Sequence, residues 1–315
     1  MPIKLAVIMD PIESIKIQKD STFAMLLEAQ RRNWEVHYVV PNSSYVIDGK
    51  PFAQTSVLHV EDNEYAWFKT ESVNDELLSD FNVILMRKDP PFDMEYIYTT
   101  YILGLTKKSG TVVINDPTAL RNFNEKFSIF NFPQCCAPTL VTRDQDRIMK
   151  FIDQHSEVVV KPLDAMGGKS IYKISNSDNN KSELISKITQ QDSSTIMTQR
   201  FIPEITQGDK RIIIINGEPV PYALARIPKP GELLGNLAAG GQGQGIPLSK
   251  HDRWICSEIK STLIENGIAF AGIDVIGSYL TEINITSPTC VRELDKQFNL
   301  NISAQLFDHI ETLLA

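Results

Sequence analysis

The sequence predicts an α/β protein, with a parallel sheet in its N-terminal part and α+β organisation in its C-terminal part. Two stretches, 3–40 and 82–116, alternate strand and helix patterns, as parallel sheets do. Beyond residue 122 the pattern changes to strands joined by glycine-containing loops and hairpins. The length of 315 residues exceeds what one hydrophobic core usually supports, so we expect two or three domains.

Composition and charge exclude several classes of partner. The chain is 42% hydrophobic and 22% charged, which is ordinary for a soluble globular protein. A net charge of −8 argues against nucleic acid or an anionic membrane as the main partner. A small anionic ligand remains compatible with this charge, because a local basic cluster can override the mean.

The sequence also indicates a cytoplasmic protein without a zinc site. The first apolar run is followed at once by Asp10 and Pro11, which predicts a strand and not a signal peptide, and no run approaches ~18 apolar residues. The five histidines are scattered and the cysteines lack metal-ligand spacing, so we interpret the cysteines as reduced thiols. The cysteines are Cys135, Cys136, Cys256 and Cys290.

The first unit begins with a strand at 3–9, a helix at 21–32 with Ser21 as its N-cap, and a strand at 35–40. This order predicts parallel strands joined by a right-handed crossover. The loop after the first strand contains no glycine, so the dinucleotide-binding fingerprint is absent. Residues 42–80 are polar and hard to assign, apart from a turn at 48–54 between short strands.

Charged residues follow the next predicted strand, which ends at Arg87, Lys88 and Asp89 before two prolines. Ligands collect at the carboxyl ends of strands in open α/β sheets, so Arg87 and Lys88 could receive a substrate carboxylate. The alternative is a pair of exposed charges before a turn. A helix at 94–108 and a strand at 111–116 complete this unit, which ends near residue 122.

A glycine-rich loop marks the second unit. We expect Lys126 on a helix, helices at 144–155 and 181–191, and strands at 157–162, 171–174 and 195–203. The tetrapeptide at 167–170 is not a P-loop, because Leu163 stands where the motif needs glycine and a strand follows instead of a helix. A glycine hairpin can still cover phosphates, with Lys126 and Lys161 supplying charge. An ordinary hairpin turn is the alternative.

The third unit begins with a hairpin at 208–228 whose turn is Asn216-Gly217. Residues 228–249 form the longest irregular segment, which we interpret as a lid or binding loop, with a disordered linker as the alternative. We expect helices at about 251–266 and 300–314.

Oxygen-bearing side chains in residues 272–289 indicate a metal site. Glu282 and Asn284 share one face of a predicted strand, and Asp274 lies on the preceding strand. Two carboxylates and an amide suit Mg²⁺; the alternative is a hairpin with a polar, wet face. A three-residue turn at 277–279 would pair Asp274 with Glu282, whereas a two-residue turn would send Asp274 to the opposite face. We therefore predict the longer turn.

Taken together, these motifs resemble the ATP-grasp superfamily and, within it, the bacterial glutathione synthetase family. The motifs are Lys126, Lys161, MGG at 166–168, GDKR at 208–211, GNLAAGG at 235–241, GIDVIG at 272–277 and TEINITSPT at 281–289, with RKDPPFD at 87–93. The resemblance covers roughly residues 3–313. It implies a Rossmann-like domain (1–122), a central ATP-grasp lid subdomain (123–200) and a C-terminal ATP-grasp subdomain (201–315).

The resemblance also implies roles for individual residues. Arg211 and Arg226 would meet the transferred phosphoryl group and the peptide carboxylate, with Lys161 as a further catalytic cation. Nucleotide binding would involve Lys126, Lys161, Met166, Gly167, Gly168, Gln199, Arg200, Phe201, Ile202 and Asp209, with residues 199–202 offering backbone groups to adenine. Substrate binding would involve Arg87, Lys88, Asn236, Ser287, Pro288 and Thr289. Metal ligands would be Asp274, Glu282 and Asn284.

The implied reaction joins γ-glutamylcysteine to glycine through an acyl phosphate, with ATP as a substrate and Mg²⁺, or Mn²⁺, as the metal. A homotetramer is implied as well. Leu234 and Gln242 stand where family members commonly carry arginine, and Lys169 could compensate. We therefore keep two alternatives: a carboxylate–amine ligase with another acceptor, and a weakly active nucleotide-binding paralogue with a regulatory role. Cys290 lies beside the site, where we expect it to serve packing.

Overall fold

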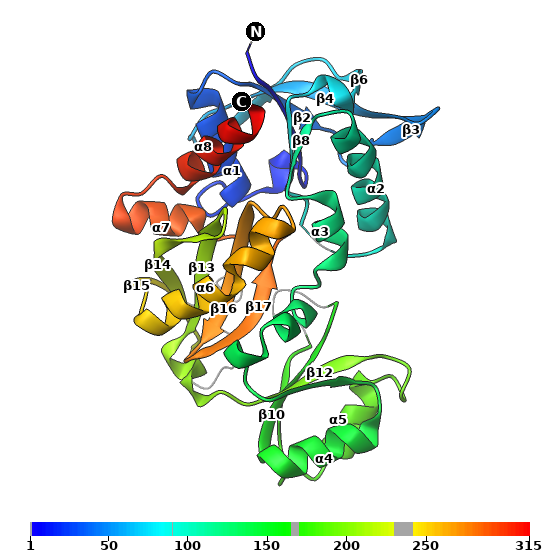
Figure 1. The fold of residues 1–315 in the computed structure, drawn as a ribbon, viewed down its shortest axis with the longest axis vertical. Coiled ribbons are helices and arrows are strands. Elements are labelled where there is room, and N and C mark those ends of the chain that lie inside the picture. The colour runs from blue at the N-terminus through cyan, green and yellow to red at the C-terminus, as the bar shows by residue number, and fades with distance from the viewer. Residues whose placement is uncertain (1, 90, 165–169, 230–241) are drawn as a thin grey trace.

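A computed structural model describes residues 2–89, 91–164, 170–229 and 242–315. The molecule is elongated, and its three sheets follow one another along the long axis (Figure 1). The N-terminal sheet lies at one end, the five-stranded sheet in the middle and the four-stranded sheet at the other end. Helices and strands are both abundant, in agreement with the predicted α/β class.

Parallel strands form the centre of the N-terminal sheet, as predicted. The strand order is β3-β4-β2-β1-β7-β8, and β2, β1, β7 and β8 run parallel. These four span Glu35–Val39, Lys4–Ile8, Val83–Met86 and Val112–Ile114. Helices α1 (Ser21–Arg31) and α2 (Met94–Lys108) accompany them. The N-cap of α1 is Asp20, whose carboxylate accepts from the Phe23 amide, so the assignment of Ser21 as N-cap is wrong.

The stretch that the sequence left unassigned widens this sheet with antiparallel strands. These are β3 (Tyr45–Ile47), β4 (Lys50–Val60), β5 (Phe68–Thr70) and β6 (Asn74–Leu77). The β3–β4 turn uses Asp48 and Gly49, both with positive φ, which suits a tight hairpin.

The central sheet has the order β11-β10-β12-β9. Its strands are β9 (Thr139–Thr142), β10 (Glu157–Pro162), β11 (Tyr172–Ser175) and β12 (Ile196–Arg200). Helices α4 (Gln145–His155) and α5 (Lys181–Ile188) contribute to its own apolar cluster. Because β11 follows the glycine-rich loop, the exclusion of a P-loop is confirmed.

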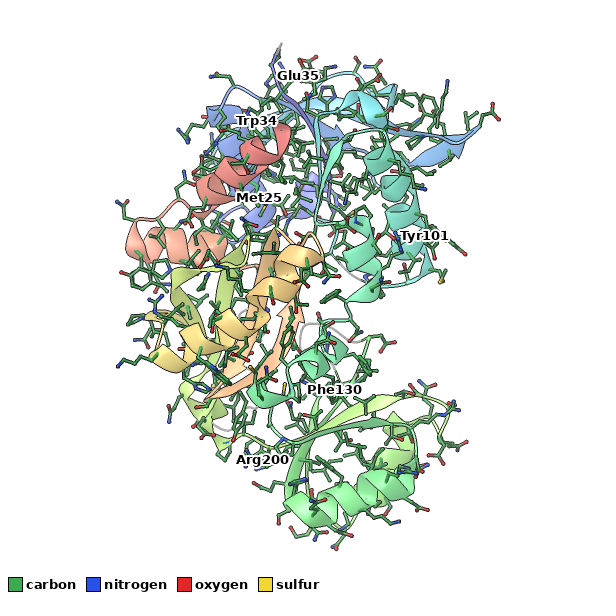
Figure 2. All side chains as sticks on the ribbon, viewed as in Figure 1. Met25, Trp34, Glu35, Tyr101, Phe130 and Arg200 are labelled. Atoms are coloured by element: carbon green, nitrogen blue, oxygen red, sulfur yellow. The ribbon has the colours of Figure 1, made fainter. Side chains whose placement is uncertain are left out.

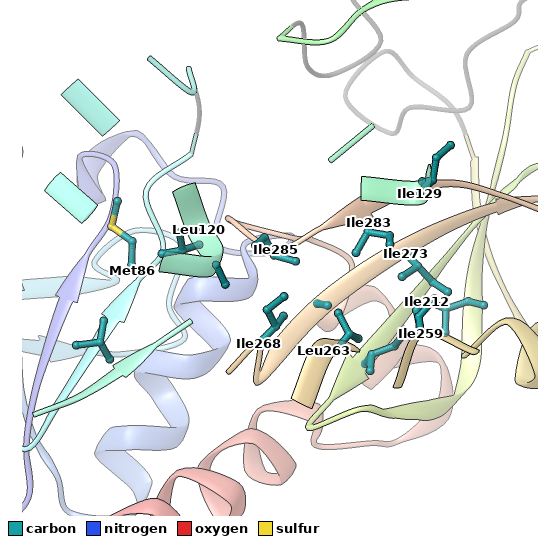
Figure 3. Packing of buried hydrophobic residues seen from close by; sticks show 14 of the residues in the cluster. Met86, Leu120, Ile129, Ile212, Ile259, Leu263, Ile268, Ile273, Ile283 and Ile285 are labelled. Carbon is teal, nitrogen blue, oxygen red and sulfur yellow. The ribbon is translucent and has the colours of Figure 1, made fainter. Parts of the chain in front are cut away.

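The C-terminal sheet has the order β15-β14-β13-β16-β17. Its strands are β13 (Asp209–Ile215), β14 (Glu218–Ile227), β15 (Gln242–Pro247), β16 (Phe270–Ile276) and β17 (Tyr279–Asn284). The Asn216-Gly217 turn is confirmed, with φ of 47° and 77°. The segment 228–249 is not irregular throughout, because β15 pairs with β14. Figure 3 shows Ile212 of β13 near Ile259 and Leu263 of α6 (Lys250–Glu265).

The end of the chain returns to the N-terminal sheet. Helix α8 (Ile302–Leu314) packs on α1, and the Phe307 and Trp34 rings lie 4.9 Å apart. Figure 2 shows Trp34 next to α8. Two short helices, α3 (Pro117–Asn122) and α7 (Val291–Phe298), were not predicted. Within the described part of the chain, no helix is long and apolar enough to span a membrane.

Candidate active site

Strand register places the predicted charged residues on one face of the C-terminal sheet. Asp209 pairs with Arg226 across β13 and β14, and Arg211 pairs with Asp274 across β13 and β16. Asp274 in turn lies opposite Glu282 on β17. Paired residues point to the same face, and residues two apart along a strand do so as well. All five side chains therefore lie on the same face.

The turn that brings Asp274 and Glu282 together differs from the prediction. Ile276 pairs with Tyr279, so the turn has two residues, Gly277 and Ser278, and the predicted three-residue turn is wrong. The register shifts by one residue between the Asp274 and Val275 pairs, which is a β-bulge in β17. The bulge supplies the extra residue that a longer turn would have supplied. Asp274 therefore stays on the face of Glu282 despite the short turn.

A buried network of alternating charges occupies the middle of this face. The Arg211 guanidinium donates two hydrogen bonds to Asp274, one of them 2.9 Å from Nη2 to Oδ2. Arg226 Nη2 lies 2.8 Å from Asp274 Oδ2 and also donates to Asp209. Burial opposes the charged form of Asp274, but the two arginines outweigh it and hold the pKa of Asp274 well below its usual range. Burial raises the pKa of Asp209 to about 6, despite Arg226.

Two buried lysines reach the neighbouring carboxylate. Lys126 Nζ lies 3.7 Å from Glu282 Oε1, and Lys161 Nζ lies 4.0 Å from the same atom. The two side chains are only 2% and 7% exposed. Burial lowers the pKa of Lys161, whereas Glu282 and Glu125 outweigh burial and raise that of Lys126. The prediction that Lys126 lies on a helix is wrong, because Lys126 directly precedes the 3₁₀ helix Phe127–Asn131.

Glu125 belongs to the same cluster, and the sequence analysis missed it. Its carboxylate is hydrogen-bonded to Lys126 Nζ, and its backbone carbonyl accepts from the Ile283 amide at 2.8 Å. Burial, followed by the charge of Glu282, raises its pKa to about 7. Its place directly before Lys126 was the only signal in the sequence.

Two family models together match most of this chain. A family model described as "Prokaryotic glutathione synthetase, ATP-grasp domain" matches residues 125–299, and one described as "Prokaryotic glutathione synthetase, N-terminal domain" matches residues 3–121. The chain belongs to the prokaryotic glutathione synthetase family.

Relatives named glutathione synthetase match this chain over nearly its whole length. A protein named glutathione synthetase from Xanthomonas campestris pv. campestris is 50% identical over 311 residues, which is 99% of this chain and 98% of the relative. Another from Pseudomonas aeruginosa is 48% identical over 315 residues, covering 100% of this chain and 99% of the relative.

Solved structures show the fold. D-cycloserine synthetase DcsG superposes with a TM-score of 0.66 at 15% identity, covering 98% of this chain and 99% of that one. The ATP-grasp ligase PsnB, complexed with a minimal precursor, Mg and ADP, gives a TM-score of 0.63 at 14% identity, covering 98% of both chains. The fold is therefore that of ATP-grasp ligases, which use ATP and a divalent metal.

The predicted metal ligands of this glutathione synthetase family member converge. Asn284 Nδ2 lies 3.5 Å from Asp274 Oδ2, and Glu282 is the cross-strand partner of Asp274. The described residues contain no group of three or more His, Cys, Asp and Glu side chains suited to a metal, and metal binding by Asp274, Glu282 and Asn284 stays a prediction. Carboxylate and amide oxygens on one strand pair suit a hard divalent cation.

The predicted substrate segment follows β17 and packs closely on the charged face. A Cβ on Gly272 would lie 2.8 Å from Pro288 Cβ and 2.9 Å from Arg211 Cδ, so only glycine allows this approach. Ser287 is half-buried and Thr289 exposed. Cys290 is buried, and burial raises the pKa of its thiol, which favours a packing role.

Arg87 does not match the alternative of an exposed charge, because it is only 5% exposed and donates to three protein oxygens. Lys88 is half-buried. Their contacts with substrate stay a prediction.

The expected adenine segment is the end of β12 and the residues after it. The Gln199 side chain donates to Thr139 Oγ1 at 2.8 Å. The amides of Arg200 and Phe201 donate to the Pro138 and Glu157 carbonyls. These two amides are therefore engaged within the protein, and the contribution of 199–202 to adenine binding stays a prediction.

Several predicted residues lie outside the described part of the chain. These are Met166, Gly167, Gly168, Lys169, Leu234 and Asn236, together with the side chain of Gln242.

Proposed function

We propose that the protein is an ATP-dependent ligase that joins γ-glutamylcysteine to glycine, giving glutathione, ADP and phosphate. The single observation that carries this proposal is the convergence of four cations and three oxygen-bearing side chains on one sheet face. The cations are Lys126, Lys161, Arg211 and Arg226. The relatives named glutathione synthetase, at about half identity over the full chain, support the choice of substrates.

The four cations would reduce the electrostatic repulsion between the two anionic reactants. The dipeptide carboxylate has to approach a γ-phosphate that is also anionic, so the site must neutralise both partners. Lys126 and Lys161 would bind the nucleotide phosphates, while Arg211 and Arg226 would orient the carboxylate and the transferred phosphoryl group. Asp274, Glu282 and Asn284 would hold Mg²⁺, or Mn²⁺, which supplies further positive charge to the phosphates.

The acyl phosphate formed in this way would react with the glycine amine, releasing phosphate. Such an intermediate hydrolyses readily, so water has to be excluded until the amine attacks. The protein needs no covalent nucleophile for either step, which fits a buried, protonated Cys290.

The test is a coupled assay of ADP release in which ATP, Mg²⁺, γ-glutamylcysteine and glycine are omitted in turn. We expect ADP release only with all four present, and glutathione as the product. No ADP release from the complete mixture would refute the proposal. The altered residues Leu234 and Gln242 favour one alternative, a ligase with another acceptor, and replacing glycine by alanine or glutamate in the same assay tests it.

Two further expectations accompany this function. We propose a homotetramer, which light scattering on the purified protein tests directly. We also propose a cytoplasmic location, in keeping with four free cysteines.

A further inference from the structure

We propose that Arg87 is a positioning residue, which holds the bend at 286–288 of the substrate segment from the N-terminal sheet by binding two of its backbone carbonyls. The expected effect of Arg87 on kinetics rests on the proposed function. Its effect on the order of residues 285–291 can be tested without that function. This role also replaces the simpler idea that Arg87 binds a substrate carboxylate directly.

The guanidinium of Arg87 reaches across the domain boundary. Its Nη1 donates to the Thr286 carbonyl at 3.3 Å and its Nη2 to the Pro288 carbonyl at 3.1 Å. Its Nε donates to Thr22 Oγ1 at 3.2 Å, and its Cζ lies 5.1 Å from the centroid of the Phe270 ring. Every nitrogen of the group therefore has a protein partner, and the side chain is buried. A direct substrate contact would have to compete with these bonds.

Other N-terminal residues hold the two ends of the same segment. The Asn115 amide donates to the Ile285 carbonyl at 2.7 Å. The Ser21 hydroxyl accepts from the Val291 amide at 3.3 Å. Residues 285–291 are therefore fixed at both ends and in the middle by residues of the first 115. Arg87 is the central contact, because among the described residues it is the side chain that binds two carbonyls of the bend.

This bend bears directly on the charged face. Pro288 and the Arg211 side chain both approach Gly272 so closely that a Cβ there would meet each within 3 Å. A shift of the bend would therefore disturb the packing beside Arg211 as well as the position of Ser287. Displacements of about 1 Å in positioning groups can cost on the order of 100-fold in rate.

The geometry requires arginine specifically. A planar guanidinium presents several donors in a fixed fork, whereas a lysine ammonium is a compact charge on a flexible stem. Arg87→Lys keeps the positive charge but cannot hold both carbonyls and Thr22 at once. A substrate carboxylate bound by charge alone would tolerate this change better than the bend would.

The test compares Arg87→Lys with wild type by hydrogen-exchange mass spectrometry on the ligand-free protein and by steady-state kinetics. We expect exchange within 285–291 to become at least about tenfold faster. We also expect kcat/KM for γ-glutamylcysteine to fall about 10- to 100-fold, with KM for ATP within about twofold. Arg121→Lys is the matched control, because Arg121 also donates to a backbone carbonyl in the N-terminal unit, that of Thr100 at 3.1 Å, and its side-chain hydrogen bonds to described residues go to Thr100 and Thr118. It should change neither readout.

The outcomes separate the explanations. Unchanged exchange with a large loss of kcat/KM would overturn the proposal in favour of direct substrate binding, and no change in either readout would overturn it altogether. Thr22→Val serves as a second variant should Arg87→Lys fold poorly. It removes only the Nε partner and should give a smaller effect in the same direction; unchanged exchange in that variant would count against the proposal. If wild type makes no glutathione, the proposed function fails, while the exchange data still decide the role of Arg87.

Discussion

Asp274 is the residue on which the charges of the site depend. It is the shared partner of Arg211 and Arg226, and all three side chains are buried or nearly so. Removing one member of a buried ion pair leaves an uncompensated charge, at a cost of about 3–5 kcal/mol. We expect Asp274→Asn to lower the free energy of unfolding by about 3 kcal/mol, as measured by urea denaturation, and to abolish ADP release.

The control at the same scale is an exposed ion pair. Asp308 pairs with Arg32 Nη2 at 2.6 Å, but its side chain is 68% exposed. Surface pairs contribute at most about 1 kcal/mol, so Asp308→Asn should change neither stability nor activity appreciably. Equal effects of the two substitutions would show that Asp274 has no special place in the network.

At the scale of elements, the β-bulge in β17 is the device that builds the site. Thr281 is buried in the bulge, and its hydroxyl donates to the Asp274 carbonyl at 3.1 Å. Thr281→Val keeps the shape but removes that hydrogen bond to a buried carbonyl, which costs about 0.5–1.5 kcal/mol. We expect this loss in urea denaturation, together with a higher Mg²⁺ concentration for half-maximal activity. Thr281→Ser should retain both properties, and a valine variant with unchanged Mg²⁺ dependence would contradict the prediction.

A hydrogen bond between α7 and the start of α8 predicts how the stability of the protein depends on pH. Asp295 accepts from the Ile302 amide at 3.0 Å, and burial raises its pKa to about 6. The unfolded value is about 3.9, so the folded chain binds more protons between these values. Stability from this carboxyl is therefore complete below about pH 4 and is lost as pH rises through 6.

We expect Asp295→Asn to remove this dependence. Between pH 4.5 and 7.5, wild type should lose about 1 kcal/mol more stability than the variant, a figure reduced for the partial exposure of the group. Urea denaturation at both pH values measures the difference. Parallel curves for the two proteins would contradict the assignment.

The elements show what the sequence could predict and what it could not. Strands such as 157–162 and helices such as 94–108 were predictable, because their apolar periodicity matches one face of a sheet or helix. Helix α7 was missed because its short, polar sequence has only Val291 and Leu294 buried. A three-residue turn was predicted in place of Gly277-Ser278, because a single sequence carries no signal for the β-bulge that keeps Asp274 on the face of Glu282. The four hydrogen bonds from Ser21, Arg87 and Asn115 to residues 285–291 join segments about 170 to 270 positions apart in sequence, which local patterns cannot reveal.

At the scale of the whole molecule, the two ends of the chain share their cores. Each of the two large apolar clusters contains residues of both the N-terminal sheet and the C-terminal sheet, for example Met86 with Ile273, and Val7 with Ile213. The third cluster is drawn only from residues 148–196 of the central unit. The N- and C-terminal units should therefore unfold together, and the central unit should open separately and at lower free energy.

Asn115 tests this division. Its buried amide donates to the Phe270 and Ile285 carbonyls, both at 2.7 Å, and its oxygen accepts from the Phe270 amide at 2.9 Å. Asn115→Ala leaves three buried backbone groups without partners, so we expect the joint N- and C-terminal unit to lose about 3 kcal/mol or more. Native-state hydrogen exchange should show this loss in β1, β7 and β16, while the opening free energy of residues 139–200 stays unchanged. Equal loss in the central unit would mean that all three sheets unfold as one. Asn82→Ala is the control, because the Asn82 side chain lies at an exposed site and accepts one hydrogen bond, from the Lys4 amide. It should leave both values within about 0.5 kcal/mol of wild type.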